Sequence, residues 1–202
     1  GLPLTVFRLT GEEEAAVLEM GISDFGEMSR LTKIAKPDVA VITNIGLCHL
    51  ENLKSRDGIL KAKTEIFEGL KNDGIICLNG DDDKLSTVTS YKNNKIIFFG
   101  KNNNNEIKAS DICNLGLKGT ACKIITPSGE ISVKIPVPGI HMVYNALAGT
   151  AVGCTYGLTL EQIKQGIETL QSVSGRFHII ETGKYTVVDD CYNANPVSMK
   201  AS

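Results

Sequence analysis

The sequence contains no apolar run that approaches the length of a membrane span, and it shows no signal peptide. Its formal net charge is only −2, so no basic field points to nucleic acid or to an anionic membrane as a partner. The six cysteines form neither a Cys-x-x-Cys pair nor another metal-binding spacing. Together these absences predict a cytoplasmic protein with reduced thiols.

The phosphate-binding motif Gly-x-x-x-x-Gly-Lys-Ser/Thr is also absent. The Gly-Lys pairs that do occur, Gly100-Lys101 and Gly183-Lys184, are followed by Asn and Tyr. The chain starts at Gly1 rather than at a methionine, and it ends at Ser202, shortly after an expected strand. We therefore expect an internal fragment of a longer protein.

The residues that are present predict an α/β protein. Apolar residues make up 42% of the sequence, which is enough for a sizeable core in one large domain or in a domain with a piece of another. Short apolar runs alternate with helical patterns, which predicts a mostly parallel sheet flanked by helices, and closely spaced short runs later predict an antiparallel β ribbon. Asp24 and the run Thr159-Leu-Glu-Gln162 are candidate helix caps. The expected strands are 15–20, 39–45, 74–79, 95–99, 106–113, 119–126, 130–137 and 184–189, and the expected helices are 24–35, 59–70, 141–154 and 159–170.

Lys63 is unusual because it lies within an apolar helical stripe that contains Ile59, Ile66 and Phe67. Two interpretations are open. Either the stem of the side chain lies on the core while the ammonium reaches water, or the amine is buried, with a lowered pKa, and acts as a nucleophile or is chemically modified. Lys61 lies off the stripe and has no such feature.

Glu19 and His49 each follow a predicted strand, and a predicted helix connects the two strands. If the strands are parallel, both side chains lie at the same edge of the sheet, and Lys63 follows one loop later. We therefore expect Glu19, His49 and Lys63 to form a cation site, with Mg²⁺ as the candidate ion. The alternatives are an ordinary strand-end Glu and a structural or solvent-facing His.

Three further features each have two interpretations. Asn145, near the start of a helix rich in small residues, either contacts a ligand or faces solvent. Arg176 follows Gly175, and its guanidinium suits a phosphate, although simple surface charge is the alternative. The run from Asp81 to Asp83 predicts a solvated turn or a helix cap.

Several segments form an ordered set of motifs, which are Glu19-Met-Gly21, Thr43-Asn-Ile-Gly-Leu-Cys-His-Leu-Glu51, Lys61-Ala-Lys-Thr-Glu-Ile-Phe67, Leu78-Asn-Gly-Asp-Asp82, Gly139-Ile-His-Met-Val-Tyr-Asn-Ala-Leu147, Gly175-Arg176 and Asp189-Asp-Cys-Tyr-Asn-Ala-Asn-Pro196. Together they resemble the Mur ligase family. The resemblance covers essentially the whole chain. It is strongest to the family member that joins D-alanyl-D-alanine to a UDP-N-acetylmuramoyl-tripeptide.

The resemblance implies a parent protein with an N-terminal UDP-substrate domain, a central ATPase domain and a Rossmann-like C-terminal domain. Residues 1–177 would be most of the central domain, and residues 178–202 would open the C-terminal one with its first strand. The family's phosphate loop would lie upstream of Gly1. The implied reaction uses ATP and Mg²⁺ to phosphorylate the carboxylate of the UDP-muramoyl peptide. The amine of D-alanyl-D-alanine then attacks the acyl phosphate, which extends a peptidoglycan precursor.

The resemblance also implies roles for single residues at the metal site. Glu19 and His49 would be Mg²⁺ ligands. Lys63 would react with CO₂ to give a carbamate, which turns a cation into an anion that helps to hold the metal. The carbamate would give a lysine on an apolar stripe a function in metal binding.

At the nucleotide, the resemblance implies that Asn145 contacts the adenine and that Arg176 and Asp190 contact the phosphate or ribose. Met142 departs from the family pattern, which usually has Asn at that position. The resemblance assigns the domain junction to Tyr192, Asn193 and Asn195.

Two alternatives stay open at this point. One is another amide ligase of the same fold, such as a different Mur ligase or a folylpolyglutamate or cyanophycin synthetase relative. The other is a nucleotide-binding module without catalysis. In either case we expect these 202 residues alone to be inactive, because no phosphate loop occurs in them. We also expect self-association through exposed sheet edges.

Overall fold

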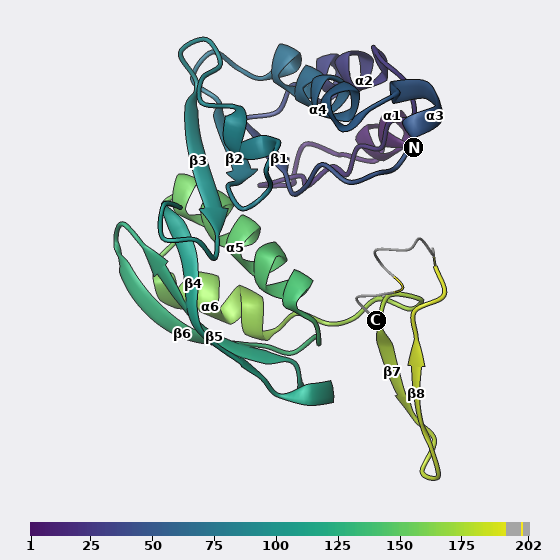
Figure 1. Ribbon diagram of the computed structural model, residues 1–202, viewed down its shortest axis with the longest axis vertical. Helices are drawn as coiled ribbons and strands as arrows, with labels where there is room; N and C mark the ends of the chain where they lie inside the picture. The colour runs from purple at the N-terminus through teal and green to yellow at the C-terminus, as the bar shows by residue number, and fades with distance from the viewer. Residues whose placement is uncertain (193–198, 200–202) are drawn as a thin grey trace. The chain divides into compact units, whose positions relative to one another are not determined.

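The computed structural model describes residues 1–192 and 199. The chain forms two compact units, residues 1–98 and 99–202, whose elements are labelled in Figure 1. Strand β3 (Lys95–Gly100) runs through the boundary between the units. The boundary expected at residue 177 separates family domains and stays a prediction. Within the described part, no helix combines the length and the hydropathy that a bilayer crossing requires.

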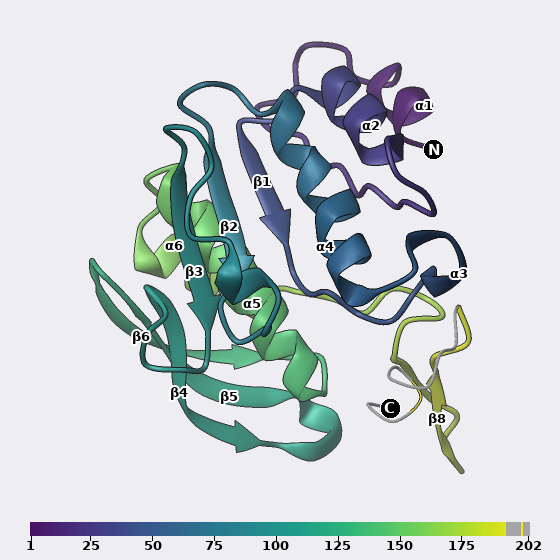
Figure 2. The ribbon, with the colours of Figure 1, turned by 45° about the horizontal axis from the view of Figure 1, so that its top comes forward.

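The first unit contains a parallel pair of strands with helices over it. Strands β1 (Val39–Ile42) and β2 (Ile75–Asn79) are parallel, with Val39 opposite Ile75 and Ile42 opposite Leu78, and β3 follows β2 in the strand order. Helix α4 packs over these strands (Figure 2). The helical segments of this unit are α1 (Leu2–Val6), α2 (Glu27–Ala35), α3 (Leu50–Leu53), α4 (Arg56–Thr64), and the 3₁₀ turns η1 (Glu65–Gly69) and η2 (Leu85–Thr87).

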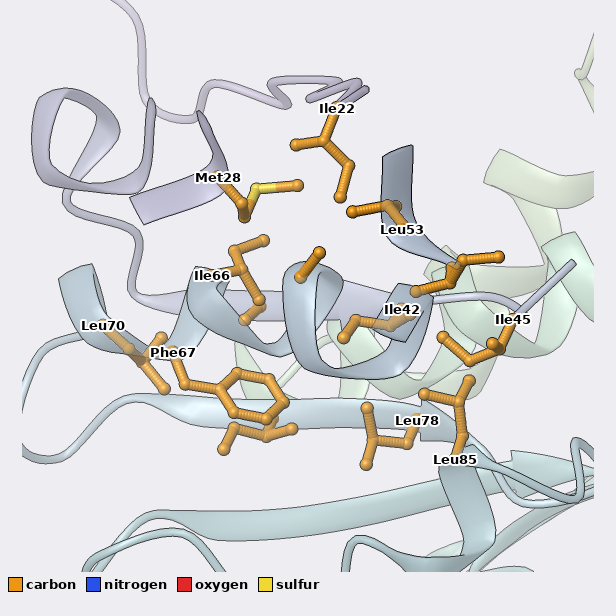
Figure 3. Packing of buried hydrophobic residues seen from close by; sticks show 14 residues of the cluster. Ile22, Met28, Ile42, Ile45, Leu53, Ile66, Phe67, Leu70, Leu78 and Leu85 are labelled. Carbon is orange, nitrogen blue, oxygen red and sulfur yellow. The ribbon is translucent and has the colours of Figure 1, made fainter. Parts of the chain in front are cut away.

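The core of this unit follows the two predicted patterns. The apolar stripe along α4 and η1 buries Ile59, Ile66 and Phe67, and β1 and β2 contribute Ile42 and Leu78 (Figure 3). Each such side chain contributes about 1.5–3 kcal/mol when it is fully buried. The sequence therefore predicted this core, although the expected helix 59–70 begins earlier, at Arg56, and tightens into a 3₁₀ turn after Thr64.

Two predictions in this unit are wrong. Residues 15–20 do not form a strand, and among the described residues they have no strand neighbour. An apolar run becomes a strand only where a neighbour accepts its backbone hydrogen bonds. Asp24 is not an N-cap either, because α2 begins at Glu27 after Gly26, and the Asp24 carboxylate accepts a hydrogen bond from the Phe25 N–H.

The second unit contains the predicted antiparallel ribbon. The end of β3 pairs in parallel with β4 (Ile107–Asn114), and β4, β5 (Thr120–Thr126) and β6 (Gly129–Ile135) are antiparallel. A short 3₁₀ turn, η3 (Gly116–Lys118), joins β4 to β5. Helices α5 (Ile140–Thr155) and α6 (Leu160–Glu168) follow, and Thr159 and Gln162 form the predicted capping box.

A separate two-stranded sheet follows α6. Strand β8 (Thr186–Asp189) matches the expected strand, and it pairs antiparallel with β7 (His178–Glu181), which the sequence analysis missed. The sequence of β7 is too short and too mixed in polarity to stand out as a strand by itself. Its backbone hydrogen bonds are completed by pairing with β8, with His178 opposite Asp189 and Glu181 opposite Thr186.

Candidate functional site

The loop that follows β1 is held by side chains from other parts of the first unit. The Asn79 amide, at the end of β2, donates to the Thr43 carbonyl at 3.0 Å. The Lys63 ammonium, on α4, donates to the Asn44 carbonyl at 2.8 Å. The next residue, Ile45, is bonded at both of its backbone groups. This loop lies at the carboxyl ends of two parallel strands, which is where ligands bind in open α/β sheets.

Ile45 is fixed by an acid on one side and by an arginine on the other. Asp82 Oδ2 accepts a hydrogen bond from the Ile45 N–H at 2.8 Å, and Arg56 Nε donates to the Ile45 carbonyl at 3.1 Å. The terminal nitrogens of Arg56 donate to both carboxylate oxygens of Asp83, at 2.8 and 2.5 Å. This bidentate pair fixes the plane of the guanidinium and so fixes the direction of Nε.

The Asp82 carboxylate accepts hydrogen bonds from two segments of the chain. Its Oδ1 accepts from the N–H groups of Lys84 and Leu85 at 2.9 and 3.0 Å, at the start of η2. The helix-cap interpretation of the aspartate run is therefore confirmed for Asp82. Hydrogen bonding to the Arg56 guanidinium lowers the pKa of Asp83, which is otherwise exposed.

Lys63 is half-buried, and its surroundings contain features of both interpretations. Its Nζ donates a hydrogen bond to the backbone carbonyl of Asn44. Burial lowers the pKa of the amine, while the nearby Cys48 and Asp82 act in the opposite direction. A reactive or modified Lys63 stays a prediction.

Glu19 and His49 lie in different environments. Glu19 is exposed in the unpaired segment, so the predicted strand end that would have placed it at the sheet edge does not exist. His49 is exposed and left-handed (φ 60°) at the N-cap of α3. Hydrogen bonds from the backbone N–H groups of Ser23 and Asp24 lower the pKa of the Glu27 carboxylate at the start of α2.

The three expected metal ligands do not fit a Mg²⁺ ion in their unmodified form. In residues 1–192 and 199 no three His, Cys, Asp or Glu side chains converge in a group that could hold a metal. Lys63 as an ammonium is a donor and cannot be a ligand. A ligand set built on Lys63 therefore requires its conversion to an anion.

The sequence analysis missed several residues of this site. Glu65 accepts hydrogen bonds from the N–H groups of Gly26, at 2.9 Å to each oxygen, and Ser29, at 3.3 Å, so it caps α2 from 36–39 residues away. Asn79 ends β2 and Asp82 follows it, and the strand-end argument applied to Glu19 and His49 would have selected them as well. Nothing in the sequence pattern marks Arg56.

In the second unit, the residues expected at the nucleotide are exposed. The Asn145 amide donates to Met142 Sδ at 3.4 Å, so the residue that departs from the family pattern lies directly beside it. Asp190 Oδ1 accepts from the N–H of Phe177 at 3.1 Å. The Arg176 guanidinium lies 4.1 Å from the centre of the Tyr192 ring. The structure therefore brings the segments that carry Arg176 and Asp190 together, whereas Asn193 and Asn195 lie outside the described residues.

The fold is an α/β domain with an antiparallel ribbon, and comparison with known families identifies its class. The Mur ligase middle domain matches residues 1–153. The chain therefore belongs to the Mur ligase family.

Individual relatives cover the whole chain. The chain is 39% identical over 203 aligned positions to the UDP-N-acetylmuramoyl-tripeptide–D-alanyl-D-alanine ligase of Bacillus subtilis, covering 100% of this chain and 43% of the relative. It is 37% identical to the Escherichia coli protein of the same name, covering 100% of this chain and 45% of that protein. The chain thus spans less than half the length of these curated relatives.

Solved structures show the same likeness. A crystal structure of MurF from Acinetobacter baumannii matches with a TM-score of 0.92 and 34% identity, covering 99% of this chain and 44% of that one. MurF from Thermotoga maritima in complex with ADP matches with a TM-score of 0.80 and 32% identity, covering 92% of this chain and 42% of that one.

Proposed function

We propose that this chain is part of an ATP-dependent ligase that joins D-alanyl-D-alanine to a UDP-N-acetylmuramoyl-tripeptide through an acyl phosphate, in cytoplasmic synthesis of the peptidoglycan precursor. The observation that carries the proposal is the likeness over the full chain to ligases of that name and to MurF structures, one of them in complex with ADP. The half-buried Lys63, held at the sheet edge, agrees with it.

The site assignments are part of the same proposal. Asn145, Arg176 and Asp190 contact the nucleotide. Lys63 as a carbamate, together with Glu19 and His49, would hold Mg²⁺, and the ion would neutralise charge between the reacting groups. Only a neutral amine adds to CO₂, and the partial burial of Lys63 favours the neutral form of its amine.

The test is ADP release by the complete gene product that contains this chain. We expect release to require UDP-N-acetylmuramoyl-tripeptide, D-alanyl-D-alanine and MgATP together. Release with a different amino acid or dipeptide in place of D-alanyl-D-alanine would assign another ligase of this fold. No release with any acceptor, while ATP still binds, would support a nucleotide-binding module without catalysis.

Lys63 has a matched control two residues away. Lys61 is exposed, so Lys61→Gln should leave the rate within about twofold of wild type. Lys63→Gln should lower kcat about 100-fold or more, because the side chain can no longer become an anion. Equal effects of the two substitutions would contradict the role assigned to Lys63.

A further inference from the structure

We propose that Arg56 and Asp82 are positioning residues, which hold the loop leading to His49 in place through the backbone of Ile45. Their effect on the ligase reaction rests on the proposed function. Their effect on the loop does not, and the two are tested separately below.

Ile45 is the fixed point of this loop because its side chain and its backbone are both held. Its side chain is only 2% exposed and lies in the core beside Leu78 and Leu85 (Figure 3). A buried residue cannot turn its N–H and C=O to water, so each group needs a partner within the protein. Here both partners are charged side chains, Asp82 and Arg56, and bonds of this kind are stronger than neutral ones.

Even a conservative substitution of Asp82 or Arg56 removes a hydrogen bond. Asp82 uses Oδ2 for Ile45 and Oδ1 for Lys84 and Leu85, whereas an asparagine offers a single acceptor oxygen. Arg56 uses Nε for Ile45 and its two terminal nitrogens for Asp83. A lysine has one ammonium and cannot reproduce that fork. These substitutions therefore remove specific contacts while keeping size, and for Arg56→Lys also charge.

The position of Ile45 affects the groups on both sides of it. The preceding residue, Asn44, accepts the hydrogen bond from Lys63. The loop then runs through Gly46 to His49, whose left-handed backbone starts α3. A shift at Ile45 would therefore displace Lys63 and His49 together. Small misplacements of reacting groups are costly in enzymes, about 100-fold in rate for 1 Å.

The first arm of the test measures hydrogen exchange at the Ile45 amide, in the 202-residue chain, for Arg56→Lys and Asp82→Asn. Asp57→Asn is the comparison variant, since it removes the ion pair with Lys84 from the same helix while Asp82 and Arg56 keep their hydrogen bonds to Ile45. We expect exchange at Ile45 to rise about tenfold or more in Asp82→Asn and also in Arg56→Lys, because one hydrogen bond to a charged group is lost. The control should stay at the wild-type rate. Wild-type exchange in both loop variants would overturn the proposal.

The second arm measures kcat and KM separately in the complete gene product. We expect kcat to fall about tenfold or more in both loop variants, while KM for ATP stays within about twofold. The double variant should lose less than the product of the single losses, because both residues act on Ile45. An equal loss in Asp57→Asn, or a change in KM alone, would contradict positioning. If the wild type has no ligase activity, the proposed function fails, and the exchange arm still decides the claim about the loop.

Discussion

The loop from Thr43 to Ile45 and the segment from Ala15 to Met20 lie in the same unit. The loop leads to one expected metal ligand, His49, and the segment contains another, Glu19. The loop is bonded to side chains from α4, from the end of β2 and from the turn after β2. The segment at 15–20 has no strand neighbour among the described residues, and Val17 within it is 98% exposed. The difference shows that an apolar run forms a strand or a fixed loop only where groups elsewhere in the chain complete its backbone hydrogen bonds.

The two segments differ most in the burial of Ile45 and Val17. Ile45→Ala should destabilise the first unit by about 2–5 kcal/mol, because it leaves a cavity beside Leu78 and Leu85. Val17→Ala should change stability by less than about 0.5 kcal/mol, because the side chain of Val17 is 98% exposed. Chemical denaturation of both variants measures the difference, and similar losses would mean that the two segments are equally packed.

A second pair of variants compares two glutamates that accept backbone hydrogen bonds over different distances along the chain. Glu65 caps α2 from a distant segment, whereas Glu13 accepts from Thr10 and Gly11 within its own turn. Glu65→Gln should cost about 1 kcal/mol of stability, and Glu13→Gln should have no measurable effect. Denaturant midpoints for the two variants provide the measurement. A loss in Glu13→Gln as large as that in Glu65→Gln would contradict the account.

Acid should weaken the loop through Asp83. Hydrogen bonding to Arg56 holds the folded-state pKa of Asp83 below its unfolded value of about 3.9. The stability from this pair is therefore present above about pH 3.9 and is lost as pH falls through the folded pKa. Thermal midpoints recorded from about pH 5 to about pH 2 should fall more steeply for wild type than for Arg56→Gln. Parallel curves would show that the pair does not contribute.

The smallest expected effect concerns self-association. Among the described strands β1 has a single neighbour, β2, and an open strand edge can pair with an extended apolar segment of a second copy. Light scattering should therefore detect weak, concentration-dependent dimers, and Val17→Lys should reduce them. A strictly monomeric wild type would contradict this expectation.

Most of the architecture could be predicted from the sequence. Periodicity located the core of α4, the strands and the antiparallel ribbon, because burial on one face leaves a repeating pattern in the residues. The strand at 15–20 failed because pairing depends on a neighbour, and periodicity does not report neighbours. The hairpin strand β7 was missed because its four residues are too few and too mixed in polarity to form a recognisable pattern.

The candidate site could be predicted only in part. Lys63 could be selected from the sequence because a charged residue interrupts an otherwise apolar helical stripe. Arg56, Asp82 and Glu65 act through the backbone of residues 11 to 39 positions away, and a bond to a distant backbone group leaves no pattern of residue types. The roles of Glu19, His49, Lys63, Asn145, Arg176 and Asp190 stay predictions.

The most direct test of the account is amide hydrogen exchange in the unsubstituted protein, resolved at Ile45 and at Val17 in one experiment. We expect strong protection at Ile45, whose N–H is bonded to Asp82, and exchange near the intrinsic chemical rate at Val17. Equal exchange at the two amides would contradict the claim that the loop after β1 is held in place and the segment before α2 is not.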